Sequence, residues 1–148
     1  MTDLDIRPLF TTYQEVVEDG GADPVGGAAT QEVFRKGWLT DRVVYVATAL
    51  DEVVGSYFIR PNFPAFAAHI AQSGYIVARR ARGQGIGSRL VAHSIEEARR
   101  LGYTAMMFNL VFETNPSRRI YESYWFEMIG RVPEVRGDEG ALIYWRRL

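Results

Sequence analysis

The sequence "VARRARGQGIGSRLV", residues 77–91, joins a hydrophobic run to a helical segment through a turn rich in glycine and arginine. Glycine at positions 83, 85 and 87 lets the backbone approach a ligand with no Cβ in the way. Backbone N–H groups at a helix start favour an anion, and Arg82 adds a charge-assisted donor. We interpret the turn as a pyrophosphate site. The alternative is a plain strand-to-helix turn that needs glycine only for its geometry.

Two well-known glycine motifs do not fit this turn. A P-loop requires a lysine and a serine or threonine directly after its last glycine, and no such lysine follows here. The dinucleotide fingerprint G-x-G-x-x-G requires two residues before its last glycine, whereas only Ile86 separates Gly85 from Gly87. Neither nucleotide motif therefore accounts for the glycines of this turn.

Composition narrows the range of functions. With 148 residues, 47% of them hydrophobic, the chain is expected to form one soluble domain over residues 1–148. A net charge of −1 argues against nucleic acid or an anionic membrane as a partner. The absence of cysteine excludes disulfides, thiolate metal sites and a cysteine nucleophile, and two histidines make a metal site improbable. We expect no metal.

The N-terminus carries no sign of a targeting segment. Its first residues, "MTDLDIRPL", are acidic and lack an apolar core, so they do not form a secretory signal. No apolar run approaches the roughly 20 residues that span a bilayer. The default expectation is a cytoplasmic protein, and a homodimer is left open as its oligomeric state.

Hydrophobic patterning predicts an α/β (α+β) domain. Residues 4–9 predict a short strand ended by Pro8, and residues 10–19 a helix. A second short helix follows over residues 30–40, capped by Thr30. The remaining expected elements are strands over 41–50, 52–60, 68–77, 103–112, 126–132 and 141–148, and helices over 85–101 and 115–125. This order favours one central, mostly antiparallel seven-stranded sheet.

Two segments carry a resemblance to a known family. Residues 77–91 resemble the acyl-CoA motif [R/Q]-x-x-G-x-[G/A] of the GNAT (Gcn5-related) N-acetyltransferase superfamily, with Arg82, Gly85 and Gly87 in its three defined positions. The stretch "FNLVFETNPSRRIYESYWF", residues 108–126, is similar to the second GNAT signature. Both motifs occur in the family's order, which makes the resemblance specific.

The second signature matches residue by residue, with two departures. Asn115 matches the asparagine that opens the helix, Tyr121 the tyrosine, and Phe126 the closing phenylalanine. Trp125 stands where the family usually has glycine, and the segment between Asn115 and Tyr121 is one residue shorter than the common form.

The resemblance implies the GNAT fold, with the fourth and fifth strands splayed apart and helices on both faces of the sheet. It also implies acetyl-CoA as co-substrate. Backbone groups of the fourth strand would then pair with the pantetheine arm, and the glycine turn would hold the pyrophosphate. The residues implied are Tyr75, Ile76 and Val77 for pantetheine and Arg82, Gly83, Gln84, Gly85, Ile86, Gly87 and Ser88 for pyrophosphate.

The resemblance further implies catalytic roles. Tyr121 would be the general acid that protonates the departing thiolate, the alternative being a half-buried tyrosine that only packs. Asn115 would hydrogen-bond the pantetheine arm or the acetyl end, or serve as a plain N-cap. Glu113, His69 and Tyr75 are candidates for the base that accepts the amine proton, and a water chain alone is the other option.

The acceptor is inferred from a narrower resemblance. Residues 108–132 are similar to fungal acetyltransferases that act on proline analogues such as azetidine-2-carboxylate. This implies a small-molecule amine, primary or secondary, attacking directly in a ternary complex. Asn109 and Arg118 would help to bind its carboxylate, although Asn109 could instead tie down the splayed strand. The alternatives are a catalytically silent acyl-CoA-binding module and an enzyme that acts on a peptide or protein amine.

Overall fold

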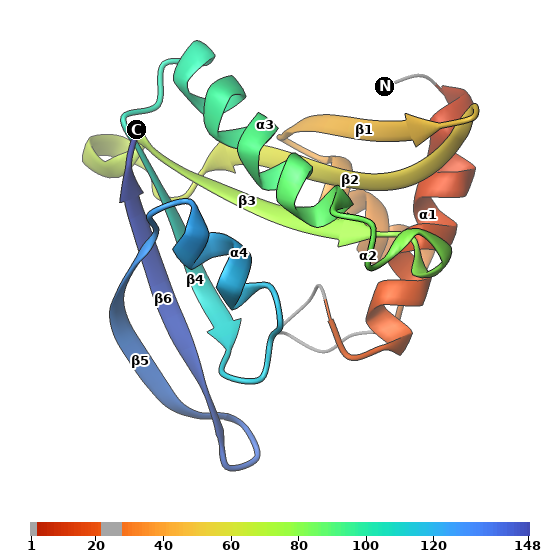
Figure 1. The fold of residues 1–148 in the computed structure, drawn as a ribbon. Helices are drawn as coiled ribbons and strands as arrows, with labels where there is room; N and C mark the ends of the chain where they lie inside the picture. The colour runs from red at the N-terminus through yellow and green to blue at the C-terminus, as the bar shows by residue number, and fades with distance from the viewer. Residues whose placement is uncertain (1–2, 22–27) are drawn as a thin grey trace. The chain divides into compact units, whose positions relative to one another are not determined.

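The structure, a computed structural model, describes residues 3–21 and 28–148. It has four α-helices in the described ranges: α1 (Asp3–Glu18), α2 (Gln31–Phe34), α3 (Ile86–Arg100) and α4 (Arg118–Ser123). Its strands are β1 (Val43–Ala49), β2 (Glu52–Pro61), β3 (Ile70–Val77), β4 (Ala105–Phe112), β5 (Glu127–Arg136) and β6 (Glu139–Arg147) (Figure 1). Shorter turns cover Arg35–Leu39, Ala65–Ala67 and Arg79–Ala81.

The strands form one sheet in the order β1-β2-β3-β4-β6-β5. Strands β1 and β2 make the expected antiparallel hairpin, and β6 pairs antiparallel with both β4 and β5. Strands β3 and β4 are parallel, in a ladder that joins Ile70 to Ala105 and Ala71 to Met106. The mixed α/β class and the mostly antiparallel sheet are therefore confirmed.

The described part of the chain has six strands rather than seven, because residues 4–9 are helical. Helix α1 runs through Pro8, which is exposed and removes only one backbone donor. Apolar residues recur at helical spacing, and Leu9 and Tyr13 are buried in the core. This long apolar face outweighs the short alternating pattern that predicted a strand.

The chain divides into two compact units, which are described one at a time: residues 1–60 with 74–90, and residues 61–73 with 91–148. The core of the first unit is an aromatic cluster from α1, α2, the turn that follows α2, β2 and β3. Its buried members are Leu9, Tyr13, Phe34, Trp38, Phe58 and Ile76. Thr30 caps α2 as expected, since its hydroxyl accepts from the Val33 N–H at 3.2 Å.

A close approach in the first unit positions the start of α3. A Cβ added at Gly55 on β2 would lie 3.0 Å from the carbonyl oxygen of Ile76 and 3.1 Å from a methyl group of Leu90. Glycine at position 55 therefore lets the first turns of α3 pack tightly on β2 and β3. This packing fixes the start of α3, which directly follows the glycine turn.

The second unit contains β4, β6 and β5 side by side, with α4 beside them (Figure 1). Helix α4 is held by aromatic contacts: the Tyr121 ring lies 4.6 Å from the Phe108 ring of β4 and 6.0 Å from the Tyr144 ring of β6. Phe126 stacks on Phe108 at 4.6 Å. Within residues 3–21 and 28–148, no helix is both long and apolar enough to cross a membrane.

Candidate functional site

The glycine turn presents open backbone at the start of α3. Gly83 and Gly85 have φ of +75° and +78°, in the left-handed region that disfavours side chains with a Cβ. A Cβ built at either position would meet no heavy atom within 4 Å, so these glycines are not required by packing. The first N–H groups of α3, which begins at Ile86, have no intrahelical acceptor. The turn therefore suits an anion that approaches the backbone closely.

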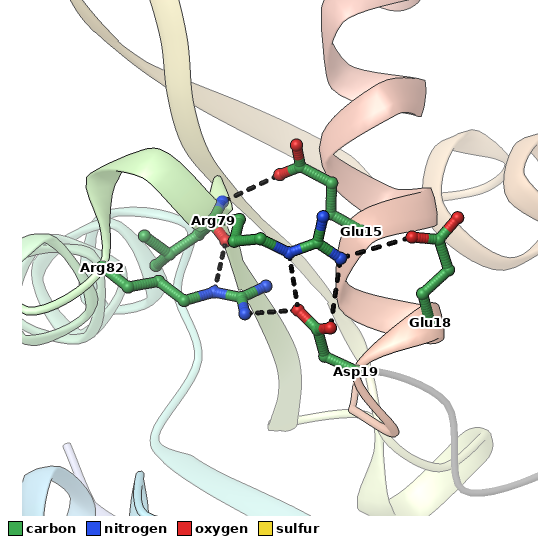
Figure 2. A network of polar contacts seen from close by, with 6 residues as sticks. Glu15, Glu18, Asp19, Arg79 and Arg82 are labelled. Carbon is green, nitrogen blue, oxygen red and sulfur yellow. Dashed lines mark hydrogen bonds and ion pairs between the residues drawn. The ribbon is translucent and has the colours of Figure 1, made fainter.

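The arginines beside the turn are paired with carboxylates. Arg82 Nη1 lies 2.5 Å from Asp19 Oδ2, and Arg79 contacts both Glu18 and Asp19 (Figure 2). Hydrogen bonds, first from Arg79 and then from Arg82, hold the pKa of Asp19 below its ordinary value. The Arg82 guanidinium is thus already held by an ion pair beside the turn.

The end of β3, expected to pair with pantetheine, lies in the same unit as the turn. Ile76 is buried in the core, so only its backbone is available for such a role. The carbonyl of Val77 accepts a hydrogen bond from Arg82 Nε at 3.3 Å. Tyr75 is half-buried, with its ring 6.0 Å from that of Tyr57.

In the second unit, Asn115 is not the N-cap that the sequence predicted. Helix α4 begins at Arg118 with Ser117 as its N-cap, because the chain makes a turn first. The Asn115 carbonyl accepts from the Arg118 N–H at 3.2 Å, and its side-chain Oδ1 accepts from the Ser117 N–H at 2.8 Å. The Nδ2 group of Asn115 donates to no other described residue, so it can donate to a ligand.

Tyr121 is held in a defined place by the end of α4. The N–H of Trp125 donates to the Glu122 carbonyl and that of Phe126 to the Tyr121 carbonyl, each at 3.1 Å. Trp125 has a φ of +65°. These two hydrogen bonds around a left-handed residue form a Schellman motif. In this motif the side chains at its two ends, here Tyr121 and Phe126, pack together. Tyr121 is 8% exposed in this arrangement.

Glu113 has partners that weaken it as a base. Arg131 Nε lies 2.5 Å from its Oε1, and the Gly140 N–H donates to its Oε2 at 3.1 Å. The hydrogen bond from Arg131, followed by that from Gly140, lowers the pKa of Glu113. A carboxylate stabilised in this way accepts a proton less readily. A role for Glu113 as the general base stays a prediction.

Asn109 is tied to a neighbouring loop. Its Nδ2 donates to Asn62 Oδ1 at 2.8 Å, and Asn62 Nδ2 donates back to Asn109 Oδ1 at 2.7 Å. Asn109 and Leu110 also interrupt the β4–β6 register, which shifts between Phe108 and Val111. These bonds hold Asn109 against the loop, and its role toward a substrate stays a prediction.

Arg118 and His69 are also engaged locally. Arg118 Nε donates to the Tyr144 hydroxyl at 3.1 Å, and its Nη1 donates to the Glu113 carbonyl at 2.9 Å, which anchors α4. The exposed His69 lies in the turn before β3, and its Nδ1 is 2.9 Å from the Phe66 carbonyl oxygen. A substrate role for Arg118 and a base role for His69 stay predictions.

Sequence reasoning missed the carboxylates that organise these segments. Asp19 acts on the glycine turn from 63 residues away, and Glu139 holds the loop before Asn115 through the Thr114 N–H at 3.0 Å. The one local signal was the end of α1, which has acidic residues and no base in its last turn. The negative charge at such a helix end is stabilised by cations, which must come from elsewhere in the chain.

Comparison with known proteins places both segments in one family. Residues 10–125 match the Acetyltransferase (GNAT) family. N-acetyltransferase aca1 of Schizosaccharomyces pombe is 35% identical over 99 residues, which cover 62% of this chain and 47% of that protein. The chain thus spans about half the length of this relative.

Two solved structures match this chain over its whole length. A GCN5-related N-acetyltransferase from Kribbella flavida is 33% identical, with a TM-score of 0.89 over 100% of this chain and 95% of that one. A phosphinothricin acetyltransferase from Sinorhizobium meliloti, solved in complex with AcCoA, shares the fold, with 21% identity and a TM-score of 0.83 over 100% and 85% of the two chains. The chain belongs to the acetyltransferase (GNAT) family.

Proposed function

We propose that this protein is an acetyl-CoA-dependent N-acetyltransferase that moves an acetyl group to the amine of a small molecule. The observation that carries the proposal is the glycine turn at the start of α3, where Gly83 and Gly85 leave the backbone open at positive φ. Membership of the family and the AcCoA bound to the Sinorhizobium meliloti neighbour support acetyl-CoA as the co-substrate.

The turn and the end of β3 would bind the co-substrate. The first N–H groups of α3 and those of the glycine turn donate to the pyrophosphate, and the positive end of the helix dipole favours its charge. Arg82 adds a charge-assisted hydrogen bond. Backbone groups of Tyr75 and Val77 hold the pantetheine arm. These residues bind and orient, and they do not take part in the chemical step.

Tyr121 and Asn115 would act at the acetyl end. When the amine attacks the thioester, the C–N bond forms, the C–S bond breaks and the thiolate requires a proton. The Tyr121 hydroxyl donates that proton as general acid. The Nδ2 group of Asn115, which is oriented by the bond from the Ser117 N–H, donates to the acyl end of the donor.

The amine must lose a proton to attack, and Glu113, His69, Tyr75 and water are the candidates that could accept it. The pKa of Glu113 is lowered by its bond to Arg131, so water is the more suitable first acceptor. The transfer is direct, without an acyl-enzyme, because the chain has no cysteine that could carry the acetyl group.

The acceptor class rests on residues 108–132, which resemble acetyltransferases of proline analogues. A small amino or imino acid carries both the amine that reacts and a carboxylate that an amide donor can hold. Azetidine-2-carboxylate is therefore the first probe.

The test is an acetyl-CoA turnover assay with azetidine-2-carboxylate, other small amino acids, polyamines and peptide N-termini. We expect turnover with small amino or imino acids and intersecting lines in initial-rate plots. Acetylation of peptides or polyamines alone would refute the acceptor class and leave the enzyme class intact. Parallel lines in the initial-rate plots, together with the isolation of an acetylated protein, would refute direct transfer. No turnover with any amine, despite CoA binding, would indicate a silent binding module.

A further inference from the structure

Helix α1 ends in an arrangement of charges that is unfavourable for an isolated helix. Glu15 and Glu18 lie in its last turn, Asp19 follows directly, and no basic residue stands in that turn. The carbonyl end of a helix carries a partial negative charge and is stabilised by cations. The compensating cations must therefore come from another segment.

Two arginines beside the glycine turn supply them (Figure 2). Arg79 donates from its backbone N–H to Glu15 Oε2 at 2.8 Å, and its guanidinium lies 3.3 Å from Glu18 and 3.1 Å from Asp19 Oδ1. Asp19 Oδ2 accepts from both Arg79 Nε at 3.3 Å and Arg82 Nη1 at 2.5 Å. Asp19 is thus the one carboxylate in this network that contacts both arginines.

The contacts of Arg82 leave one edge of its guanidinium available. Nη1 is used by Asp19, and Nε donates to the Val77 carbonyl at 3.3 Å. Nη2 makes no hydrogen bond with another residue in the described part of the chain. The Arg82 side chain is 38% exposed, so its head is fixed at two points and still accessible to an anion.

We propose that Asp19 is a positioning residue for the acetyl-CoA pyrophosphate, acting through Arg82. This inference rests on the proposed function. An arginine side chain has many rotamers, and fixing them at the moment of binding costs affinity. Asp19 and the Val77 carbonyl fix Arg82 in advance, with Nη2 left to meet a phosphate oxygen. Arg79 and Arg82 both contact Asp19, which reduces the repulsion between its charge and the ligand.

The test compares two acetyl donors in wild type and Asp19→Ala. One donor is acetyl-CoA, and the other is acetyl-pantetheine, which lacks the pyrophosphate. Without Asp19, the Arg82 side chain is no longer fixed before the ligand binds. The CoA dissociation constant and the acetyl-CoA KM should therefore rise about three- to tenfold. The KM for acetyl-pantetheine and kcat should stay unchanged, because neither depends on the pyrophosphate contact.

Two controls separate positioning from a general loss of structure. Glu18→Gln removes a carboxylate that pairs with Arg79 and not with Arg82, and its CoA affinity should equal that of wild type. In an Arg82→Ala background, the further change Asp19→Ala should have no effect on CoA affinity, because the two residues act as one unit.

The proposal is wrong if Asp19→Ala binds CoA as tightly as wild type or more tightly. The latter result would mean that Asp19 competes with the ligand for Arg82. Equal losses with both donors would also overturn it, since a structural defect does not distinguish them. If wild type itself binds no CoA, the proposed function fails instead, so the two failures are separate.

Discussion

The amide N–H of Phe126 donates to the carbonyl of Tyr121 at 3.1 Å, which closes the end of α4 and sets the two rings 6.1 Å apart. Trp125 occupies the left-handed position of this Schellman motif, where the family usually has glycine. The substitution by tryptophan therefore retains the turn geometry and adds local strain. Tyr121 is held by this turn through its carbonyl and its ring.

Replacing Trp125 with glycine should stabilise the protein. A left-handed residue with a Cβ costs about 1–2 kcal/mol, and the extra backbone freedom of glycine in the unfolded chain offsets about 0.5–1 kcal/mol of that gain. Trp125 is 80% exposed, so little burial is lost. Urea unfolding should show a free energy of unfolding higher by about 0.5–1 kcal/mol. Trp125→Ala, which keeps the Cβ, is the control, and a glycine variant less stable than it would disprove the strain.

Removing the Tyr121 hydroxyl should slow catalysis without weakening CoA binding. Loss of a general acid typically lowers kcat about 10²- to 10⁴-fold, while the ring contacts with Phe108 and Phe126 remain in Tyr121→Phe. Steady-state kinetics and calorimetry with CoA measure the two effects. Tyr124→Phe removes a phenol from the same segment and should leave kcat near wild type. An unchanged kcat and pH–rate profile in Tyr121→Phe would assign Tyr121 to packing alone.

The loop before Asn115 should lose support in acid. The Thr114 hydroxyl, then the Arg136 guanidinium and the Thr114 N–H, lower the pKa of Glu139 from 4.5 to about 2. Because the folded state lowers this pKa, the stabilisation is fully present above about pH 4.5 and is lost as the pH falls through about 2.

The measurement is the difference in urea midpoint between wild type and Glu139→Gln at several pH values. The difference should be largest above pH 4.5 and shrink steadily toward pH 2. Glu127→Gln, an exposed change on β5, serves as the control. A difference that stays constant from pH 6 to pH 2 would contradict the assignment.

Patterns local in sequence predicted most of the fold. The β1–β2 hairpin is predicted by two β-rich runs, β4 by a run that is apolar on both faces, and α3 by apolar residues at helical spacing. The prediction of a first strand was wrong because six residues around a proline are too few to distinguish two spacings of apolar residues. A spacing of two is typical of a strand, and a spacing of three to four is typical of a helix. Asn115 and Pro116 were read as a helix start because that pair suits the N-cap and first position, yet the chain turns once more before α4.

The contacts that organise the candidate site were beyond local reasoning. Asp19 meets Arg82 across 63 residues and Asn62 meets Asn109 across 47, and each pair depends on how distant segments come together. The sequence indicated that Asn109 needs a partner, since a polar amide in an apolar strand is costly when unsatisfied. It could not identify that partner, because the partner lies in a loop that is distant in sequence.

The most direct test of the account is calorimetry of acetyl-CoA binding to wild type, Gly85→Val and Gly37→Ala. Gly85 has a φ of +78° at the start of α3, so valine would distort the turn and place a side chain on its open face. Gly37 has no positive φ and open space around it, so alanine there should be neutral. We expect wild type and Gly37→Ala to bind with equal affinity and Gly85→Val to show no measurable binding. A cooperatively folded Gly85→Val protein that binds acetyl-CoA as wild type does would contradict the account.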